Sequence, residues 1–121
     1  EPELRLAARS RHGEVNELLA QISSQLKVKH STVTLGHMGS IVYTPENQYH
    51  SAPVFSQKIV DRVGAGDAYV SIAAPCVQAG FPMEMVAFIG NAAGAIAVAI
   101  VGNRSSVEPV ELYKFITALM K

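Results

Sequence analysis

One stretch constrains the fold more than any other: residues 60–69, which read Val-Asp-Arg-Val-Gly-Ala-Gly-Asp-Ala-Tyr. A short run that favours a β-strand, residues 57–60, leads directly into it. Glycines at positions 64 and 66 permit the tight turn from a strand into a helix, and a helix is expected to start at this pair and run towards Ala79. A strand that leads directly into a helix is typical of an α/β fold.

The first turn of a helix leaves backbone N–H groups without acceptors. Gly64, Ala65 and Gly66 are small enough for a phosphate to approach these groups, and the helix dipole adds roughly half a positive charge there. Asp67 lies in the same turn, where its carboxylate could accept the proton of an attacking hydroxyl. These four residues predict a site of phosphoryl transfer.

Two other phosphate-binding motifs fit this segment less well. A dinucleotide-binding turn wants a third small residue where Tyr69 stands. A P-loop requires Gly-Lys followed by Ser or Thr, which occurs nowhere in the chain. The structural alternative stays open: the glycines satisfy the turn geometry and Asp67 complements the helix dipole.

The N-terminal half is predicted to form helices and then strands. Apolar residues at helical spacing predict a helix over residues 15–26, after a shorter one at 4–9. β-branched runs at 31–35 and 40–43, separated by a Gly-His-Met-Gly turn, predict a hairpin. A further strand is expected at 49–54.

The C-terminal half is predicted to be helical. Pro75 lies inside the helix that follows the glycine pair, and a kink or an early end is expected there because proline donates no backbone hydrogen bond. Residues 85–101 carry no charge, but glycines and Asn91 interrupt an Ala-rich run, so a buried helix is expected rather than a membrane span. An amphipathic helix is expected over 109–119.

Composition narrows the class of protein. A chain of 121 residues with 49% hydrophobic residues and no net charge predicts one domain over 1–121, without a nucleic-acid or membrane partner. The single cysteine, Cys76, and four scattered histidines fit a cytoplasmic setting without a disulfide or a histidine metal site. Because the chain begins with Glu1 and no signal segment, it is expected to be part of a longer protein.

Three motifs follow one another along the chain. Residues 61–69 are similar to the signature Asp-Thr-x-Gly-Ala-Gly-Asp-x-Phe, residues 34–39 to Thr-Leu-Gly-x-x-Gly, and residues 90–94 with Val-Gly at 101–102 to an Ala-rich helix and its closing glycine. Together they resemble the ribokinase, or phosphofructokinase B-type, carbohydrate kinases. The last third is most similar to the heptose-phosphate kinase branch. The resemblance implies a ribokinase-like, Rossmann-like three-layer α/β/α fold, present as its C-terminal half.

The resemblance implies transfer of a phosphoryl group from ATP, with Mg²⁺, to a hydroxyl of a sugar or sugar phosphate. It makes Asp67 the catalytic base. The anion hole then consists of Gly64, Ala65 and Gly66. An alternative from another class is a non-catalytic nucleotide-binding or assembly module, a truncated kinase half.

The resemblance also implies a nucleotide site. Thr34, Gly36 and Gly39 would line it near the phosphates and ribose, and Asn91 would lie beside the adenine. The alternatives are an ordinary hairpin turn for the two glycines and a hydrogen-bonded polar residue in a helical core for Asn91. His37, between the glycines, is either an exposed turn residue or within reach of a bound nucleotide.

Many relatives hold a monovalent cation beside the anion hole. The matching positions here are Asp61, Val63 through its carbonyl, Gly102 and Ser106, which implies a K⁺ site.

Two departures separate this chain from the family pattern. Arg62 stands where the family usually has Thr. The part of the family fold that supplies most of the sugar site is absent, so the chain is expected to self-associate through the surface that this part would cover.

Overall fold

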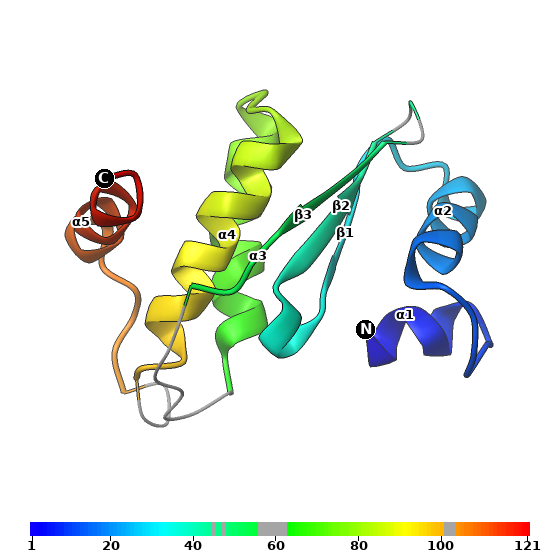
Figure 1. The fold of residues 1–121 in the computed structure, drawn as a ribbon, viewed down its shortest axis with the longest axis horizontal. Coiled ribbons are helices and arrows are strands. Elements are labelled where there is room, and N and C mark those ends of the chain that lie inside the picture. Colours follow the sequence, from blue (N-terminus) through cyan, green and yellow to red (C-terminus); the bar gives the residue numbers. More distant parts are fainter. Residues whose placement is uncertain (45, 47, 56–62, 101–103) are drawn as a thin grey trace.

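The computed structural model describes residues 1–44, 46, 48–55, 63–100 and 104–121. Three layers are stacked, with a sheet between two groups of helices (Figure 1). The elements in chain order are α1 (Pro2–Ala7), α2 (Val15–Leu26), β1 (Ser31–Thr34), η1 (Gly36–Met38), β2 (Ser40–Tyr43), β3 (Tyr49–Ala52), α3 (Ala65–Gln78), α4 (Met83–Ala97) and α5 (Pro109–Leu119). Helix α2 packs against β1 and β2. Helix α4 packs against β2 and β3 and also contacts α3 and α5.

The described strands form an antiparallel sheet in the order β1-β2-β3. Thr34 pairs with Ser40 across the first turn, and Ser40 pairs with Ala52 on the next strand. The predicted hairpin over 31–43 is thereby confirmed, with a 3₁₀ turn at its tip. The strand expected at 57–60 lies outside the described residues.

Helix α3 passes through Pro75 without ending there, so the expected early end is wrong. The chain remains helical to Gln78, and the Ala79 amide donates to the Pro75 carbonyl at 2.9 Å. Cys76 and Val77, just beyond the proline, pack against the core shared with α4. Packing of these two partly buried side chains offsets the hydrogen bond that proline cannot make.

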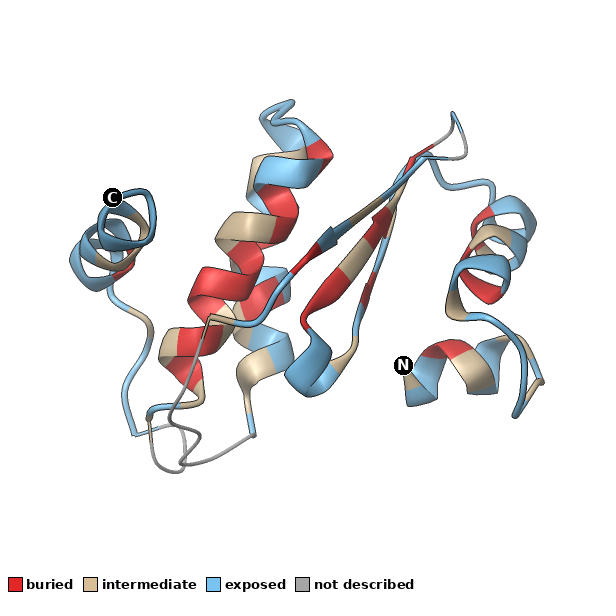
Figure 2. Ribbon diagram, in the orientation of Figure 1, coloured by how far each residue is buried: buried red, intermediate tan, exposed pale blue. Residues whose placement is uncertain are grey.

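The main core lies between the sheet and the α3–α4 pair (Figure 2). Its buried residues are Val42, Ala52, Tyr69, Ala73, Met83, Val86 and Ala87. A second cluster joins α1, α2 and β1 through Leu4, Leu18, Leu19 and Val33. A third holds α5 on α4 through Ala92, Ala93 and Leu112.

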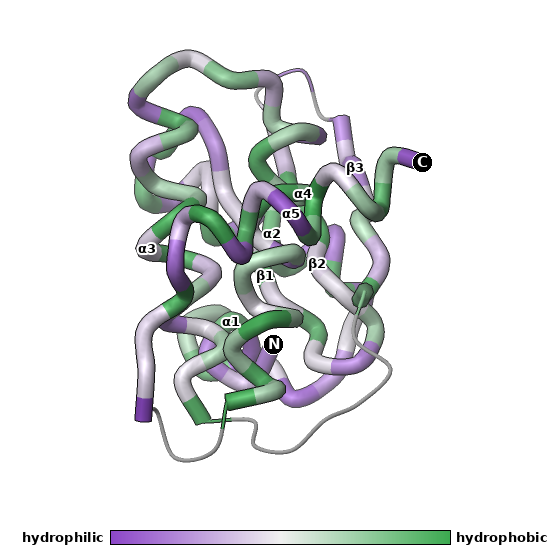
Figure 3. Tube along the Cα trace, turned by 90° about the vertical axis from the view of Figure 1, so that its left-hand side faces the viewer, coloured by the Kyte–Doolittle hydropathy of each residue, from purple (hydrophilic) through white to green (hydrophobic). Residues whose placement is uncertain are grey.

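Helix α4 is buried along most of its length, as expected from the run of residues without charge that follows Glu84 in its first turn. Hydrophobic and hydrophilic residues alternate along α5, as expected for a helix with one face on α4 (Figure 3). Within the described part of the chain, no helix combines the length and the apolar character needed to cross a membrane.

Candidate functional site

The amino end of α3 has the geometry of an anion-binding turn. Gly64 is the N-cap residue and has a φ of 85°, a left-handed conformation that favours glycine. The first backbone hydrogen bond within the helix runs from Ala68 N to Gly64 O at 2.9 Å. The amides of Ala65, Gly66 and Asp67 precede this bond and have no acceptor within α3, so they can donate to an anion.

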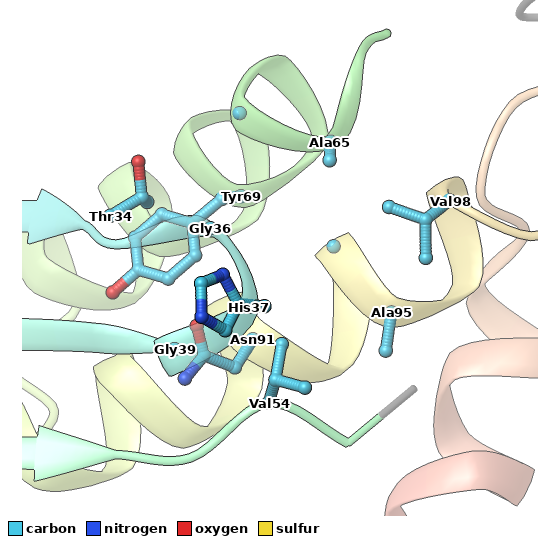
Figure 4. A pocket seen from close by; sticks show the side chains of 12 residues that line it. Thr34, Gly36, His37, Gly39, Val54, Ala65, Tyr69, Asn91, Ala95 and Val98 are labelled. Atoms are coloured by element: carbon cyan, nitrogen blue, oxygen red, sulfur yellow. The ribbon is translucent and has the colours of Figure 1, made fainter. Parts of the chain in front are cut away.

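A cavity of about 280 Å³ lies beside this turn. Figure 4 shows the side chains around it, which come from the end of β1, the β1–β2 turn, the segment after β3, and helices α3 and α4. The residues that line it are Thr34, Gly36, His37, Gly39, Val54, Ala65, Gly66, Tyr69, Asn91, Gly94, Ala95 and Val98. All four residues predicted to bind the nucleotide therefore line the same cavity as Ala65 and Gly66, two of the three residues predicted for the anion hole.

Gly39 cannot be replaced without moving the sheet. It has a φ of 89°, and a Cβ built on it would overlap the Ala52 carbonyl oxygen on β3. Gly36, with a φ of 59°, has open space where the Cβ of a larger residue would lie. Gly39 therefore does more than permit a hairpin turn, because it allows β3 to approach the turn that walls the cavity.

Asn91 is 7% exposed and ties α4 to the end of β3. Its Nδ2 donates to the carbonyls of Ala52 and Pro53 at 2.8 and 3.1 Å. Both amide protons are thus used within the protein, which agrees with the structural interpretation of this residue. Only the Oδ1 atom of the Asn91 side chain remains available to accept a hydrogen bond from a ligand in the cavity.

Tyr69 is a cavity residue that the sequence analysis did not assign. Its ring is 4% exposed, and its hydroxyl donates to Ser40 Oγ at 3.3 Å. Burial raises the pKa of the Tyr69 phenol, and the hydrogen bond to Ser40 partly offsets that rise. Its place in the sequence carried a usable signal. Residues i and i+2 of a helix point in different directions, so Tyr69 does not share the face of Asp67.

Asp67 opens onto a second cavity of about 540 Å³ on another side of the α3 turn. Gly64, Arg104 and Ser106 also line this cavity. Within the described residues, the Asp67 carboxylate accepts no hydrogen bond and forms no ion pair, so it is free to take a proton from a substrate. The first turn of α3 is thus shared between two cavities, with Gly66 facing the first and Asp67 the second.

The predicted monovalent cation site is only partly covered by the structure. Asp61 and Gly102 lie outside the described residues, as does Arg62. Ser106 lines the second cavity, and its hydroxyl donates to Glu108 Oε1 at 3.0 Å. Where the chain is described, no three His, Cys, Asp or Glu side chains cluster closely enough to hold a metal. The site remains a prediction.

Comparisons with known proteins agree with this arrangement. The family model "pfkB family carbohydrate kinase" matches residues 1–109. The bifunctional protein HldE of Koribacter versatilis is 35% identical over 120 residues, which cover 97% of this chain and 24% of that protein. HldE of Proteus mirabilis is 31% identical over 100 residues, 82% of this chain and 21% of the relative. The chain spans less than a quarter of these relatives.

Solved structures share the fold. Ribokinase of Thermotoga maritima matches with a TM-score of 0.81 and 27% identity, over 97% of this chain and 39% of that one. A putative ribokinase II of E. coli, solved with ATP and Mg²⁺, matches with a TM-score of 0.82 and 28% identity, over 98% of this chain and 37% of that one. Phosphofructokinase-2 of E. coli, solved with potassium, matches with a TM-score of 0.85 at 22% identity, over 100% of this chain and 40% of that one. The expected ribokinase-like fold, present in part, is confirmed.

Proposed function

The chain belongs to the pfkB family of carbohydrate kinases, and from that premise we propose that it supplies the ATP site, anion hole and catalytic base of a sugar kinase. The reaction is transfer of the γ-phosphoryl group of ATP to a hydroxyl of a sugar or sugar phosphate. Use of ATP and an unpaired cysteine fit a cytoplasmic enzyme.

One observation carries the proposal: a single cavity joins the β1–β2 turn to the amino end of α3. A nucleotide in this cavity would have its base beside Asn91 on α4, with its ribose and phosphates between the turn and the amides of Ala65 and Gly66. The free amides there would bind the phosphates without a basic side chain. A relative solved with ATP and Mg²⁺, at 28% identity, supports the same ligand for this chain.

In the proposed mechanism, Asp67 takes the proton of the acceptor hydroxyl. The hydroxyl oxygen then forms a bond to the γ-phosphorus while the bond from that phosphorus to the bridging oxygen breaks, and ADP leaves with the electron pair. The amides at the start of α3 stabilise the charge on the phosphoryl oxygens. Mg²⁺, when bound with ATP, neutralises phosphate charge. K⁺ beside the anion hole would add a further positive charge.

Calorimetric titration of the 121-residue chain with a non-hydrolysable ATP analogue tests the nucleotide site, with and without Mg²⁺ and K⁺. We expect binding that weakens when Gly66 is replaced by Leu, because the added side chain would occupy the cavity beside the free amides. A Cβ at position 66 meets no protein atom within 4 Å, so the substitution begins in open space. The unfolding temperature of Gly66→Leu checks that the fold survives. An analogue that does not bind the folded wild-type chain contradicts the proposal.

A second candidate is a module that binds nucleotide without catalysis. The observation in its favour is the exposed apolar surface of the chain, which spans 24% of HldE of Koribacter versatilis and 39% of the Thermotoga maritima ribokinase. Exposed apolar side chains such as Leu26 and Val70 favour self-association of the chain alone. Sedimentation over a concentration series measures this, and a phosphotransfer assay with sugars separates the two candidates, since only the kinase consumes ATP.

A further inference from the structure

The first cavity has few polar side chains available to a ligand. Asn91 donates both amide protons to β3 and the segment after it, and the Tyr69 hydroxyl donates to Ser40. Among the described lining residues, this leaves the Asn91 Oδ1 atom as an acceptor and the side chains of Thr34 and His37. Thr34 ends β1 and His37 lies on η1, so both are on different elements from the free amides of α3 (Figure 4).

His37 is also the one described lining residue that can carry a positive charge. It is exposed, on the 3₁₀ turn η1, and no hydrogen bond or ion pair within the described structure engages its imidazole. The imidazole is therefore available to an incoming anion.

The surrounding elements place no fixed negative charge in this cavity, as far as the chain is described. On α3, Asp67 lines the other cavity, and Tyr69 is neutral because burial raises its pKa. The lining residues of α4 are uncharged, and His50 of β3 is paired with Glu84 of α4 at 2.9 Å. Beside β1, the Glu1 nitrogen donates to the Thr34 carbonyl at 2.9 Å and lies 3.6 Å from the Glu3 carboxylate.

We propose that His37 binds a negatively charged group of the nucleotide as the imidazolium ion, so that nucleotide affinity depends on pH. This inference rests on the nucleotide site of the proposed function. A bound anion stabilises the protonated imidazole, so protonation and nucleotide binding favour each other. Nucleotide affinity is then higher at acidic pH and falls as the pH rises and the imidazole loses its charge.

The experiment is an NMR titration of the four histidines, with and without a non-hydrolysable ATP analogue. We expect the imidazole signals of His37 to titrate at higher pH when the analogue is bound, and those of His12 and His30 to be unchanged. Calorimetry measures the affinity at about pH 5.5 and at about pH 8. We expect the ratio of these two affinities to be roughly three- to tenfold larger in wild type than in His37→Gln. His37→Gln corrects for titration of the analogue's own phosphates, and His30→Gln is the matched control.

The outcomes separate the two proposals. Analogue binding with an unchanged His37 titration, or an equal pH dependence in wild type and His37→Gln, overturns this inference and leaves the proposed function intact. Absence of binding to folded wild-type chain at both pH values overturns both. His37→Lys adds a positive arm: it should retain affinity at about pH 8, where histidine is mostly neutral.

Discussion

Tyr69 on α3 lies so close to Gly90 on α4 that a Cβ built at position 90 would come within 2.6 Å of the ring atom Cε2. The missing side chain lets the ring enter the core, where its hydroxyl reaches Ser40 on β2. Asn91, the next residue of α4, holds β3. Two adjacent residues of one helix thus fix α3 and the sheet around the first cavity.

Gly90→Ala should therefore destabilise the protein. The added methyl overlaps the Tyr69 ring, and such overpacking costs about 1 to 3 kcal/mol of unfolding free energy. Gly94→Ala, on the same helix, is the control because its Cβ would lie at an ordinary 3.5 Å from Ala65 O. It should gain roughly 0.5 to 1 kcal/mol from helix propensity. Urea unfolding measures both, and equal effects of the two variants would refute the packing argument.

The two turn glycines should differ sharply. Gly39→Ala combines a positive φ with overlap of the Ala52 carbonyl, so we expect a loss of roughly 2 to 5 kcal/mol or failure to fold. Gly36→Ala meets no atom within 4 Å and should lose about 1 kcal/mol from backbone strain. Circular dichroism and thermal unfolding compare them; a benign Gly39→Ala would be inconsistent with this geometry.

Asn91→Ala should lower the unfolding free energy by about 1 to 3 kcal/mol, because it leaves the Ala52 and Pro53 carbonyls without their donor. Asn16→Ala on the exposed side of α2 is the control, since only the backbone carbonyl of Asn16 accepts a hydrogen bond from Tyr49. Chemical denaturation measures the difference between the variants. Similar losses for both would show that the Asn91 hydrogen bonds contribute little.

Asp67→Asn should abolish turnover while nucleotide binding is kept. Loss of a general base costs about 100- to 10,000-fold in rate, and Asp67 faces a different cavity from the nucleotide residues. The assay is phosphotransfer in the enzyme that carries this sequence, with calorimetry of the ATP analogue alongside. Glu111→Gln, a similar charge change in the first turn of α5, should keep full activity. Retained turnover in Asp67→Asn would remove it as the base.

Stability should fall in alkaline solution through Tyr69. Its folded-state pKa is raised, mainly by burial, so its stabilising effect is complete below the unfolded pKa and is lost as the pH rises through the folded pKa. Tyr69→Phe removes this titration, and the difference in unfolding free energy between wild type and variant should shrink above about pH 10. Tyr113→Phe, on exposed α5, is the control. A pH-independent difference contradicts the role of burial.

Local sequence was sufficient for most elements. The helix predicted from apolar residues between positions 15 and 26 is observed, and the hairpin over 31–43 and the start of α3 were predicted correctly. These features depend on apolar periodicity and on glycine, which act within a few residues along the chain. The same local chemistry identified the bare amides of the α3 turn, because a helix start exposes them wherever it lies.

Packing decided what local rules could not. Pro75 is tolerated because Cys76 and Val77 in the following turn pack against the core, and Asn91 binds carbonyls 38 and 39 residues away in the sequence. The sequence placed Gly66 and Asp67 in one turn, but only the tertiary structure assigned them to different cavities. Chain spacing fixes which residues share a turn; which neighbour each one faces depends on contacts between elements distant in the sequence.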